Sequence, residues 1–330
     1  MTRAFITGIS GQDGSYLADL LLDKGYEVHG LVRRTNARLA NLAHLVENPS
    51  VFGKRLWLHP GDMLDQGSLR GILEQLSPDE FYHLAGQTHV GLSFEKAEVT
   101  CELVGMGALR LLEVLRHLPK PPRLFHASSS EIFGRPDTSP QDEQTPMRPV
   151  NPYGCAKAFA TQMVAIYRER FGMFACSGIL YNHESPRRGE NFVTRKICLA
   201  AAAIKAGRQS HLALGSTTAR RDWGDARDYV RAMWMMLQQP RPEDLVLATG
   251  ELHTVQEVVE LAFGALDLDW RAHVTQDPAL VRQDEPYCLV GNAARARRAL
   301  NWQPGTSFPQ LIREMTLAAA GSHVIPQSGG

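Results

Sequence analysis

Three glycines near the start of the chain form a G-x-x-G-x-x-G loop, which constrains the fold more than any other feature of the sequence. Gly8, Gly11 and Gly14 follow a short apolar run at residues 3–7 and precede helical apolar periodicity at 15–24. Such glycines permit a tight turn, close approach of the backbone to a pyrophosphate and close helix packing, while the helix N-terminus attracts the anion. A plain strand-to-helix turn is the alternative, but the spacing favours a dinucleotide-binding βαβ unit.

The second strand, predicted at residues 27–32, ends in two arginines rather than in an acidic residue. An acidic side chain there would accept a hydrogen bond from the ribose 2′-hydroxyl of NAD, whereas a guanidinium group matches a 2′-phosphate. A solvated basic turn is the other interpretation. Arg33 and Arg34 therefore favour NADP as the cofactor.

Two later strand ends also suit a dinucleotide. Asp62 follows the strand predicted at 55–59 and could hold the amino group of an adenine. The small residues Ala85 and Gly86, after the strand at 80–84, allow close approach of the backbone to the cofactor.

Strand and helix patterns alternate along most of the chain. Further strands are predicted at 123–127 and 174–181, and helices at 100–116, 152–171 and 227–237. This alternation predicts an α/β fold, with a doubly wound parallel Rossmann sheet and a smaller, mixed α/β C-terminal lobe that binds the substrate. We assign residues 1–180 and roughly 225–250 to the Rossmann domain, and residues 181–224 and 251–330 to the second lobe.

The composition excludes several kinds of protein. Lys and Arg together number 35, as do Asp and Glu, so nothing global indicates a nucleic-acid or acidic membrane partner. No apolar run approaches the ~18 residues of a membrane-spanning helix, and we expect a cytoplasmic protein. The five cysteines are odd in number and lack C-x-x-C spacing, which predicts reduced thiols rather than a disulfide framework or a zinc site.

Four chemically active side chains are concentrated in a single stretch of the chain. Ser129 and Glu131 follow a predicted strand, and the alternation of strand side chains predicts that both leave it on the same side. An Asn-Pro pair then suits the start of a helix that carries Tyr153 and Lys157 one turn apart. Each residue alone has a structural explanation, since serine clusters form turns and isolated acids are solvated. Their joint order predicts that all four converge at the carboxyl end of the sheet.

Basic residues in the later loops could bind the phosphates of a charged substrate. Lys196, Arg221 and Arg282 are the candidates, because ammonium and guanidinium groups form strong charge-assisted hydrogen bonds to phosphate. Solvated surface arginine is the alternative interpretation, which we favour for Arg220.

The most specific segments are SSSEIFG, NPYGCAK, GILYNHESPRRGENFVTRK, RRDWGDARDYVRAMW and VLATGELHTVQE. Together with the glycine loop, they resemble the extended short-chain dehydrogenase/reductase superfamily and, within it, the GDP-mannose 4,6-dehydratase family. The glycine loop and Y-x-x-x-K occur throughout the superfamily, whereas NHESPRRG followed by FVTRK is much narrower. The resemblance covers nearly the whole chain.

The resemblance implies a set of site residues and no metal. It makes Ser129, Glu131, Tyr153 and Lys157 catalytic. It implies that the cofactor is NADP. The residues that it implies in contact with NADP are Gly8, Gly11, Gln12, Asp13, Gly14, Arg33, Arg34, Asp62, Met63, Leu84, Ala85, Gln87, Tyr153, Lys157, His183 and Arg188. It implies that the substrate is a GDP-sugar. The residues that it implies in contact with this substrate are Thr88, Ser129, Glu131, Asn182, Val193, Lys196, Leu214, Arg221, Arg282 and Glu285.

The resemblance also implies a reaction, the conversion of GDP-D-mannose to GDP-4-keto-6-deoxy-D-mannose with loss of water and internal recycling of NADP. Tyr153 would take the C4 hydroxyl proton, with a pKa lowered by Lys157 and the nicotinamide, while Ser129 orients the same oxygen. Glu131 would remove the C5 proton and help to expel the C6 hydroxyl. A homodimer or homotetramer is implied, with helices 100–116 and 152–171 forming a four-helix bundle between two copies.

Several positions depart from the family pattern. Val99 stands where relatives often have Tyr near the cofactor, and Val150-Asn151 replaces Arg-Ser before Pro-Tyr-Gly. Ser216–Thr218 and Gln283–Asp284 also differ, at segments where the preference for a sugar could change.

These departures leave alternatives open. The first is the same 4,6-dehydration of another nucleotide sugar, such as GDP-heptose or GDP-glucose. The second is an NADPH-dependent nucleotide-sugar 4-ketoreductase or an epimerase, against which Glu131 argues because neither needs a base at C5. The third is a non-catalytic dinucleotide sensor, against which the complete set of four catalytic residues argues.

Overall fold

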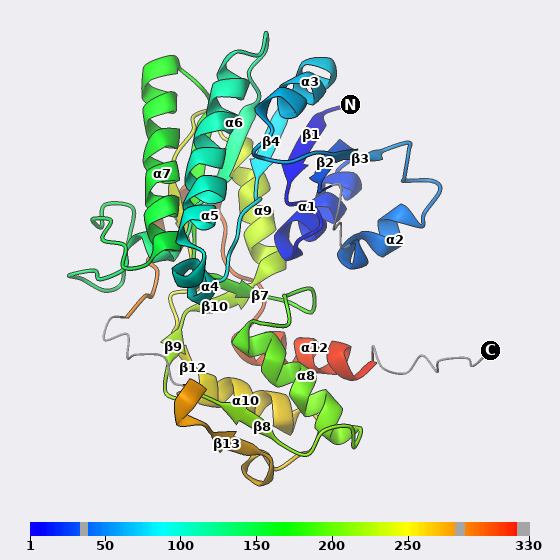
Figure 1. Cartoon of the computed structure of the whole chain (residues 1–330), viewed down its shortest axis with the longest axis vertical. Coiled ribbons are helices and arrows are strands. Elements are labelled where there is room, and N and C mark those ends of the chain that lie inside the picture. The colour runs from blue at the N-terminus through cyan, green and yellow to red at the C-terminus, as the bar shows by residue number, and fades with distance from the viewer. Residues whose placement is uncertain (34–38, 281–287, 322–330) are drawn as a thin grey trace.

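The computed structural model describes residues 1–33, 39–280 and 288–321 and contains a central sheet of seven strands (Figure 1). Every neighbouring pair in this sheet is parallel. The spatial order β11-β6-β5-β4-β1-β2-β3 is that of a doubly wound Rossmann sheet, so the predicted fold class is confirmed. In chain order the strands are β1 (Arg3–Thr7), β2 (Glu27–Val32), β3 (Leu56–Pro60), β4 (Glu80–His83), β5 (Arg123–Ala127), β6 (Ala175–Leu180) and β11 (Leu245–Leu247).

Helices cover both faces of the sheet, which is why the central strands read as nearly continuous apolar runs. One face packs against α1 (Gln12–Asp23) and α9 (Ala226–Leu237). The other packs against α3 (Gln66–Leu76), α6 (Gly107–Arg116) and α7 (Pro152–Phe171). The parallel strands run toward the smaller lobe, so that their carboxyl ends face it (Figure 1).

The smaller lobe is built around three helices, α8 (Val193–Lys205), α10 (Val255–Gly264) and α12 (Phe308–Gly321), which share an apolar core below the sheet in Figure 1. Three two-stranded pairs border it: β7 (Asn182–Glu184) with β10 (Trp223–Asp225), β8 (Leu212–Leu214) with β13 (Val274–Gln276), and β9 (Arg220–Arg221) with β12 (His253–Thr254). The shorter helices and turns are η1 (Ala40–Leu42), α2 (Ala43–Val46), α4 (Val90–Glu95), α5 (Ala97–Cys101), η2 (Glu102–Met106), η3 (Ser130–Ile132), η4 (Trp270–Ala272), η5 (Pro278–Leu280) and α11 (Ala294–Leu300).

The helix predicted at residues 100–116 differs from the observed one. It begins earlier, at α5, and a π-helical turn, η2, interrupts it before α6. Gly105 lies in this wide turn and packs against Ala156 and Phe159 of α7. Apolar periodicity cannot reveal such a turn, because it inserts one residue without changing the residue types.

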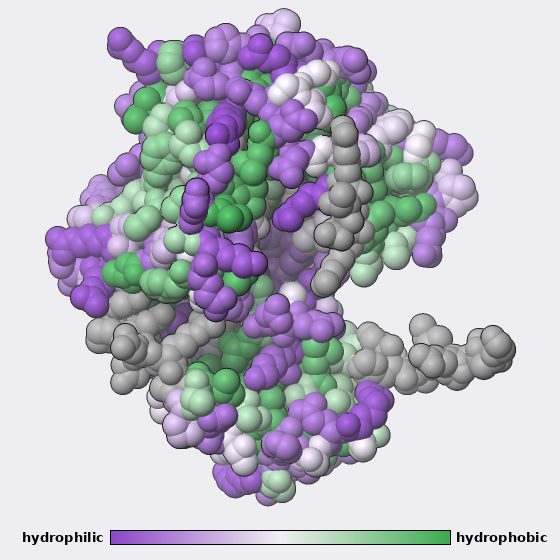
Figure 2. Space-filling view, in the orientation of Figure 1, coloured by the Kyte–Doolittle hydropathy of each residue, from purple (hydrophilic) through white to green (hydrophobic). Residues whose placement is uncertain are grey.

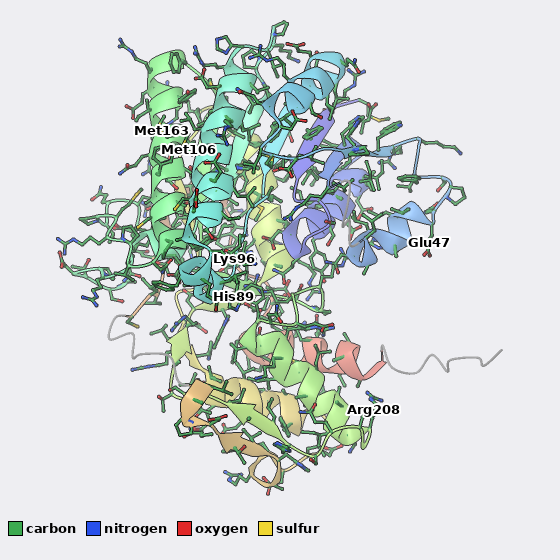
Figure 3. The ribbon with its side chains drawn as sticks, viewed as in Figure 1. Glu47, His89, Lys96, Met106, Met163 and Arg208 are labelled. Atoms are coloured by element: carbon green, nitrogen blue, oxygen red, sulfur yellow. The ribbon has the colours of Figure 1, made fainter. Side chains whose placement is uncertain are left out.

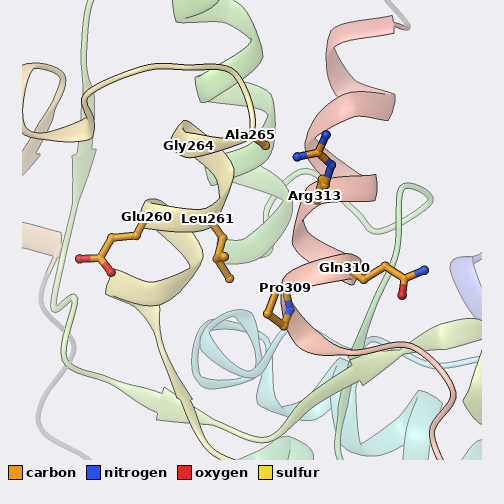
Figure 4. Close-up of a pocket in the computed structure, with 7 residues that line it drawn as sticks. All are labelled: Glu260, Leu261, Gly264, Ala265, Pro309, Gln310 and Arg313. Atoms are coloured by element: carbon orange, nitrogen blue, oxygen red, sulfur yellow. The ribbon is translucent and has the colours of Figure 1, made fainter.

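Green apolar patches on the purple surface of Figure 2 are scattered over both lobes. A groove of about 400 Å³ lies between α10 and α12, lined by Glu260, Leu261, Gly264, Ala265, Pro309, Gln310 and Arg313 (Figure 4). These residues include none of the predicted site residues. Within the described ranges, no helix combines the length and the apolar content that a membrane crossing needs. The five cysteines are free thiols.

The glycine loop yields a test of the packing. A Cβ added to Gly14 would lie 2.3 Å from the carbonyl oxygen of Gly8 and 2.6 Å from the Cα of Ile9, both of them backbone atoms. We expect Gly14→Ala to destabilise the protein by about 1–3 kcal/mol, because the loop must shift. The measurement is the free energy of unfolding in urea.

Gly71 provides the matched control, since it lies in α3 and an added Cβ would meet no atom within 4 Å. Gly71→Ala should stabilise the protein by about 0.5–1 kcal/mol, because alanine restricts the unfolded chain and favours helix. Equal effects of the two substitutions would contradict this account of the loop.

Candidate active site

The carboxyl end of β5 brings two of the predicted residues into the site. Ser129 has an extended backbone after Ala127, and the chain then enters the short turn η3, which contains Glu131. The Ser129 hydroxyl accepts a hydrogen bond from the Glu131 amide at 3.3 Å. Alternation along a continuing strand, which we expected from the sequence, is therefore not what orients these side chains; a capped turn does so.

Helix α7 carries the other two residues. Asn151 caps its first turn, with Oδ1 accepting a hydrogen bond from the Gly154 amide at 2.7 Å, and Pro152 occupies the first helical position. Lys157 Nζ lies 5.9 Å from the centre of the Tyr153 ring. The same ammonium donates a hydrogen bond to the carbonyl oxygen of Ala127 at 2.6 Å. Helix α7 is thus joined directly to the end of β5.

Burial dominates the ionisation of this pair. It raises the pKa of Tyr153 to about 12, although a hydrogen bond with Ser129 acts in the opposite direction. It also lowers the pKa of Lys157 to about 8. Without a bound nicotinamide, burial therefore disfavours the phenolate form of Tyr153. The expectation that Lys157 and the nicotinamide together lower the pKa of Tyr153 stays a prediction for the complex with the cofactor.

The glycine loop fits the pyrophosphate of a dinucleotide. Gly8 has φ +76°, which favours glycine, and an added Cβ would lie 3.0 Å from the backbone nitrogen of Ala85. Gly11 is the N-cap of α1 and has no side chain to occupy the NH groups of the first turn. Gln87 Oε1, close by in the chain to Ala85, is buried without a hydrogen-bond partner among the described residues. The backbone cradle suits an anion, and the unsatisfied Gln87 acceptor suits a hydrogen-bond donor elsewhere on a polar ligand at this edge.

Gln12 and Asp13, both predicted cofactor contacts, turn their side chains toward the segment that follows β6. Asp13 Oδ2 lies 2.9 Å from Nε2 of His183, and Gln12 Nε2 donates to the His183 carbonyl oxygen at 3.0 Å. Ser185 Oγ donates to Gln12 Oε1 at 2.8 Å. The predicted residues Asp13 and His183 are thus brought together, as an ion pair that joins the start of α1 to β7.

Arg188 lies beside the same cluster. Its guanidinium is 3.2 Å from the Glu184 carboxylate and 3.5 Å from the centre of the Phe192 ring. The positive charge of Arg188 contributes to lowering the pKa of Asp13 and opposes the rise in the pKa of Tyr153, which places it near both.

The remaining predicted cofactor contacts follow strand ends. Arg33 is exposed after β2, and Arg34 lies outside the described residues. Asp62 is exposed after β3, where Oδ1 accepts a hydrogen bond from the Leu64 amide, while Met63 is buried. The Leu84 amide donates to the carbonyl oxygen of Thr7 after β4.

The predicted substrate contacts are spread around the boundary between the lobes. Thr88 is exposed between β4 and α4, next to His89, which Figure 3 labels. Asn182 begins β7, Val193 begins α8 and Leu214 ends β8. Lys196 Nζ donates to the Ala213 carbonyl oxygen at 3.2 Å, and Arg221 Nη1 donates to that of Arg220 at 2.8 Å. Arg282 and Glu285 lie outside the described residues.

The site contains residues that the sequence interpretation did not assign to it. Glu184 and Phe192 hold Arg188, and Asn151 was predicted only as a helix cap. Glu184 stands in the narrow motif NHESPRRG, and Phe192 is the first residue of FVTRK, so these two motifs are the signal that could have indicated them. In the part of the chain that the structure describes, no group of three His, Cys, Asp or Glu side chains could hold a metal ion.

Comparisons with known proteins identify the fold and then the family. The crystal structure of DesIV, a dTDP-glucose 4,6-dehydratase from Streptomyces venezuelae with NAD and TYD bound, is similar with a TM-score of 0.83, 24% sequence identity and 96% of each chain covered. At that identity the likeness shows the fold. Together with the Ser-Tyr-Lys set, the fold defines an extended short-chain dehydrogenase/reductase.

Closer relatives give the family. A family model described as GDP-mannose 4,6 dehydratase matches residues 5–315. The chain is 48% identical to GDP-mannose 4,6 dehydratase 1 of Arabidopsis thaliana over 318 residues, covering 94% of this chain and 88% of that protein. It is 44% identical to the human GDP-mannose 4,6 dehydratase over 336 residues, covering 96% and 90%. The chain belongs to the GDP-mannose 4,6-dehydratase family.

The Asp13–His183 pair makes stability depend on pH. Burial opposes the charge on His183, but the carboxylate of Asp13 outweighs it and raises the pKa of the histidine. A histidine whose pKa is higher in the folded than in the unfolded protein stabilises the fold, and this stabilisation is complete at pH values below the unfolded-state pKa. It is lost as the pH rises through the folded-state pKa. We therefore expect the melting temperature of the natural protein to fall as the pH rises above about 6.5, and we expect His183→Gln to reduce this fall.

The measurement is the melting temperature of both proteins from about pH 6 to about pH 9, a range that brackets a histidine with a raised pKa. His44→Gln is the control, because His44 pairs with Asp19 on the surface, with nearly half of its side chain exposed. That variant should retain the slope of the natural protein. Parallel slopes for the natural protein and His183→Gln would exclude the pair as its cause.

Proposed function

We propose that this protein is a GDP-mannose 4,6-dehydratase that converts GDP-D-mannose to GDP-4-keto-6-deoxy-D-mannose with loss of water. The observation that carries the proposal is the placement of Glu131 beside the Tyr153–Lys157 pair at one strand end. The family relatives support the substrate, since their names specify GDP-mannose. The net redox change of this reaction is zero, because the hydride removed from C4 returns at C6.

Tyr153 and Ser129 act on the C4 hydroxyl. A nicotinamide cofactor supplies the hydride acceptor and donor when it is bound. The Tyr153 oxygen takes the C4 hydroxyl proton, and Ser129, which is hydrogen-bonded to Tyr153, orients the same substrate oxygen. Lys157 is charged below its pKa of about 8 and then favours the phenolate form of its neighbour.

Glu131 acts after C4 has become a ketone. The ketone acidifies the hydrogen on C5, and the Glu131 carboxylate removes this proton. The protonated carboxyl then gives the proton to the departing C6 hydroxyl, which leaves as water. A ketoreductase or an epimerase has no use for this base, so the position of Glu131 favours dehydration over the second alternative.

The test of this proposal is incubation of the purified protein with GDP-mannose and catalytic NADP, followed by mass spectrometry of the nucleotide sugar. We expect the mass to fall by one water without accumulation of NADPH. Parallel incubations with GDP-glucose, a GDP-heptose, UDP-glucose and CDP-glucose decide among sugars, because Ser216–Thr218 differs from the family pattern. Turnover of another sugar in preference to GDP-mannose would replace the proposed substrate.

Glu131→Gln is the matched variant for the same assay. General acid–base assistance is typically worth about 10²- to 10⁴-fold, so water loss should fall by at least about 100-fold. The amide has nearly the volume of the carboxylate, and the melting temperature should be retained. Normal dehydration by this variant would remove Glu131 from the mechanism.

We propose NADP rather than NAD as the cofactor. The support is Arg33, which is exposed directly after β2, where a 2′-phosphate would approach. Arg33→Ala should weaken NADP binding by about 10-fold or more, since a charge-assisted contact is lost, and leave NAD binding unchanged. Titration of intrinsic fluorescence with each dinucleotide measures this. Arg3→Ala at the opposite end of the sheet is the control, and equal losses for NADP and NAD would contradict the proposal.

We infer that the protein is a homodimer or homotetramer. The helical segment α5–α6 and the neighbouring α7 expose apolar side chains, including Met106; Figure 3 labels Met106 and Met163 on these helices. Val99 is 61% exposed and Ile166 is 49% exposed. A four-helix bundle between two copies would cover these side chains. The division into residues 1–180 with 225–250 and residues 181–224 with 251–330 remains our proposal for the domains. A cytoplasmic location remains our inference from the sequence, in which no apolar run approaches the length of a membrane-spanning helix.

A further inference from the structure

Asn151 forms two hydrogen bonds that face in different directions. Its Oδ1 accepts from the Gly154 amide at 2.7 Å, and its Nδ2 donates to Glu131 Oε2 at 2.8 Å. The side chain is buried, with 5% of the residue exposed. Because only the oxygen of the amide can accept from Gly154, the NH₂ group must face Glu131. The orientation of the amide is thus fixed by the fold.

The two elements that Asn151 bridges are pressed together. A Cβ added to Gly154 would lie 2.5 Å from the carbonyl oxygen of Glu131 and 3.1 Å from the Cβ of Pro149. The start of α7 and the turn η3 are therefore in direct backbone contact. The position of Asn151 relative to Glu131 is set by this contact, and so is the position of Tyr153, two residues further along.

We propose that Asn151 is a positioning residue that holds the Glu131 carboxylate for removal of the C5 proton. The proposal rests on the proposed function, since it assigns the step in which Asn151 acts. A carboxylate on a side chain with three rotatable bonds loses conformational freedom when it reacts, and a fixed donor on one oxygen removes part of that cost beforehand. A hydrogen bond donated to the carboxylate also favours the ionised form, which is the form that accepts a proton.

The capping role alone does not explain the second hydrogen bond. An N-cap needs one acceptor, and Ser and Asp supply it as well as Asn does. The hydroxyl of Ser is too short to extend past the cap to Glu131, whereas Asp would place a second carboxylate against the first. Asn has the length and the donor that serve both partners. The two roles can therefore be separated by substitution.

The experiment compares Asn151→Ser and Asn151→Asp with the natural protein on GDP-mannose and NADP. Rapid mixing measures C4 oxidation as the transient appearance of NADPH, and exchange of the C5 hydrogen in deuterated water together with loss of water measures the later step. We expect Asn151→Ser to retain the melting temperature and the rate of C4 oxidation. C5 exchange and water loss should fall about 10-fold, and the acid limb of their pH–rate profile should move to higher pH. Asn151→Asp should lose more of the later step.

A Glu131→Gln background provides the sharper control. If Asn151 acts through Glu131, adding Asn151→Ser to Glu131→Gln should cause no further loss of water elimination. Unchanged C5 exchange in Asn151→Ser, or an equal fall in oxidation and water loss in both variants, would overturn the proposal and leave Asn151 as a cap. Failure of the natural protein to dehydrate GDP-mannose would instead overturn the proposed function.

Discussion

The hydrogen bond between the buried Lys157 ammonium and the carbonyl oxygen of Ala127 is the interaction on which the site depends. Ala127 is the last residue of β5, so whatever follows it in the chain is placed against α7. Ser129 and Glu131 follow within four residues, and Tyr153 lies one turn before Lys157. A second buried bond, between the hydroxyls of Ser128 and Thr161 at 2.6 Å, continues the same contact one turn further along α7. Burial also sets the chemistry, because it makes the Lys157 ammonium a stronger acid than that of a surface lysine and makes Tyr153 a phenol that resists ionisation.

A second set of contacts connects the sheet with the later loops. The glycine loop gives α1 a start free of side-chain caps, and the residues just after it are held by the segment that follows β6. Arg187 of that segment extends the connection along α1, with its guanidinium 2.8 Å from Asp19 and 4.0 Å above the Tyr16 ring. The glycine loop with the start of α1 and the segment after β6 are therefore one packed unit, and a change in either should affect both.

Much of the fold could be predicted from the sequence, because the alternation of apolar strands with periodic helices is local and strong. The order of Ser129, Glu131, Tyr153 and Lys157 likewise indicated a site, since parallel strands and the helices after them meet at one edge. Three features could not be predicted, for physical reasons. The π-helical turn at Glu102–Met106 leaves no mark in residue types. The high pKa of Tyr153 comes from burial by the whole fold. The second hydrogen bond of Asn151 depends on backbone contact between two segments that are twenty residues apart in sequence.

The central claim is that one set of side chains serves three steps on a single substrate: the oxidation of C4 by a bound nicotinamide cofactor, the loss of water across C5 and C6, and the return of the same hydride to C6. GDP-mannose carrying deuterium at C4 tests this most directly, with the product examined by mass spectrometry and NMR. The account predicts that the deuterium is found at C6 of the 4-keto-6-deoxy sugar, while one solvent hydrogen enters at C5. Deuterium released to the cofactor pool, or retained at C4 in a product that has not lost water, would contradict it.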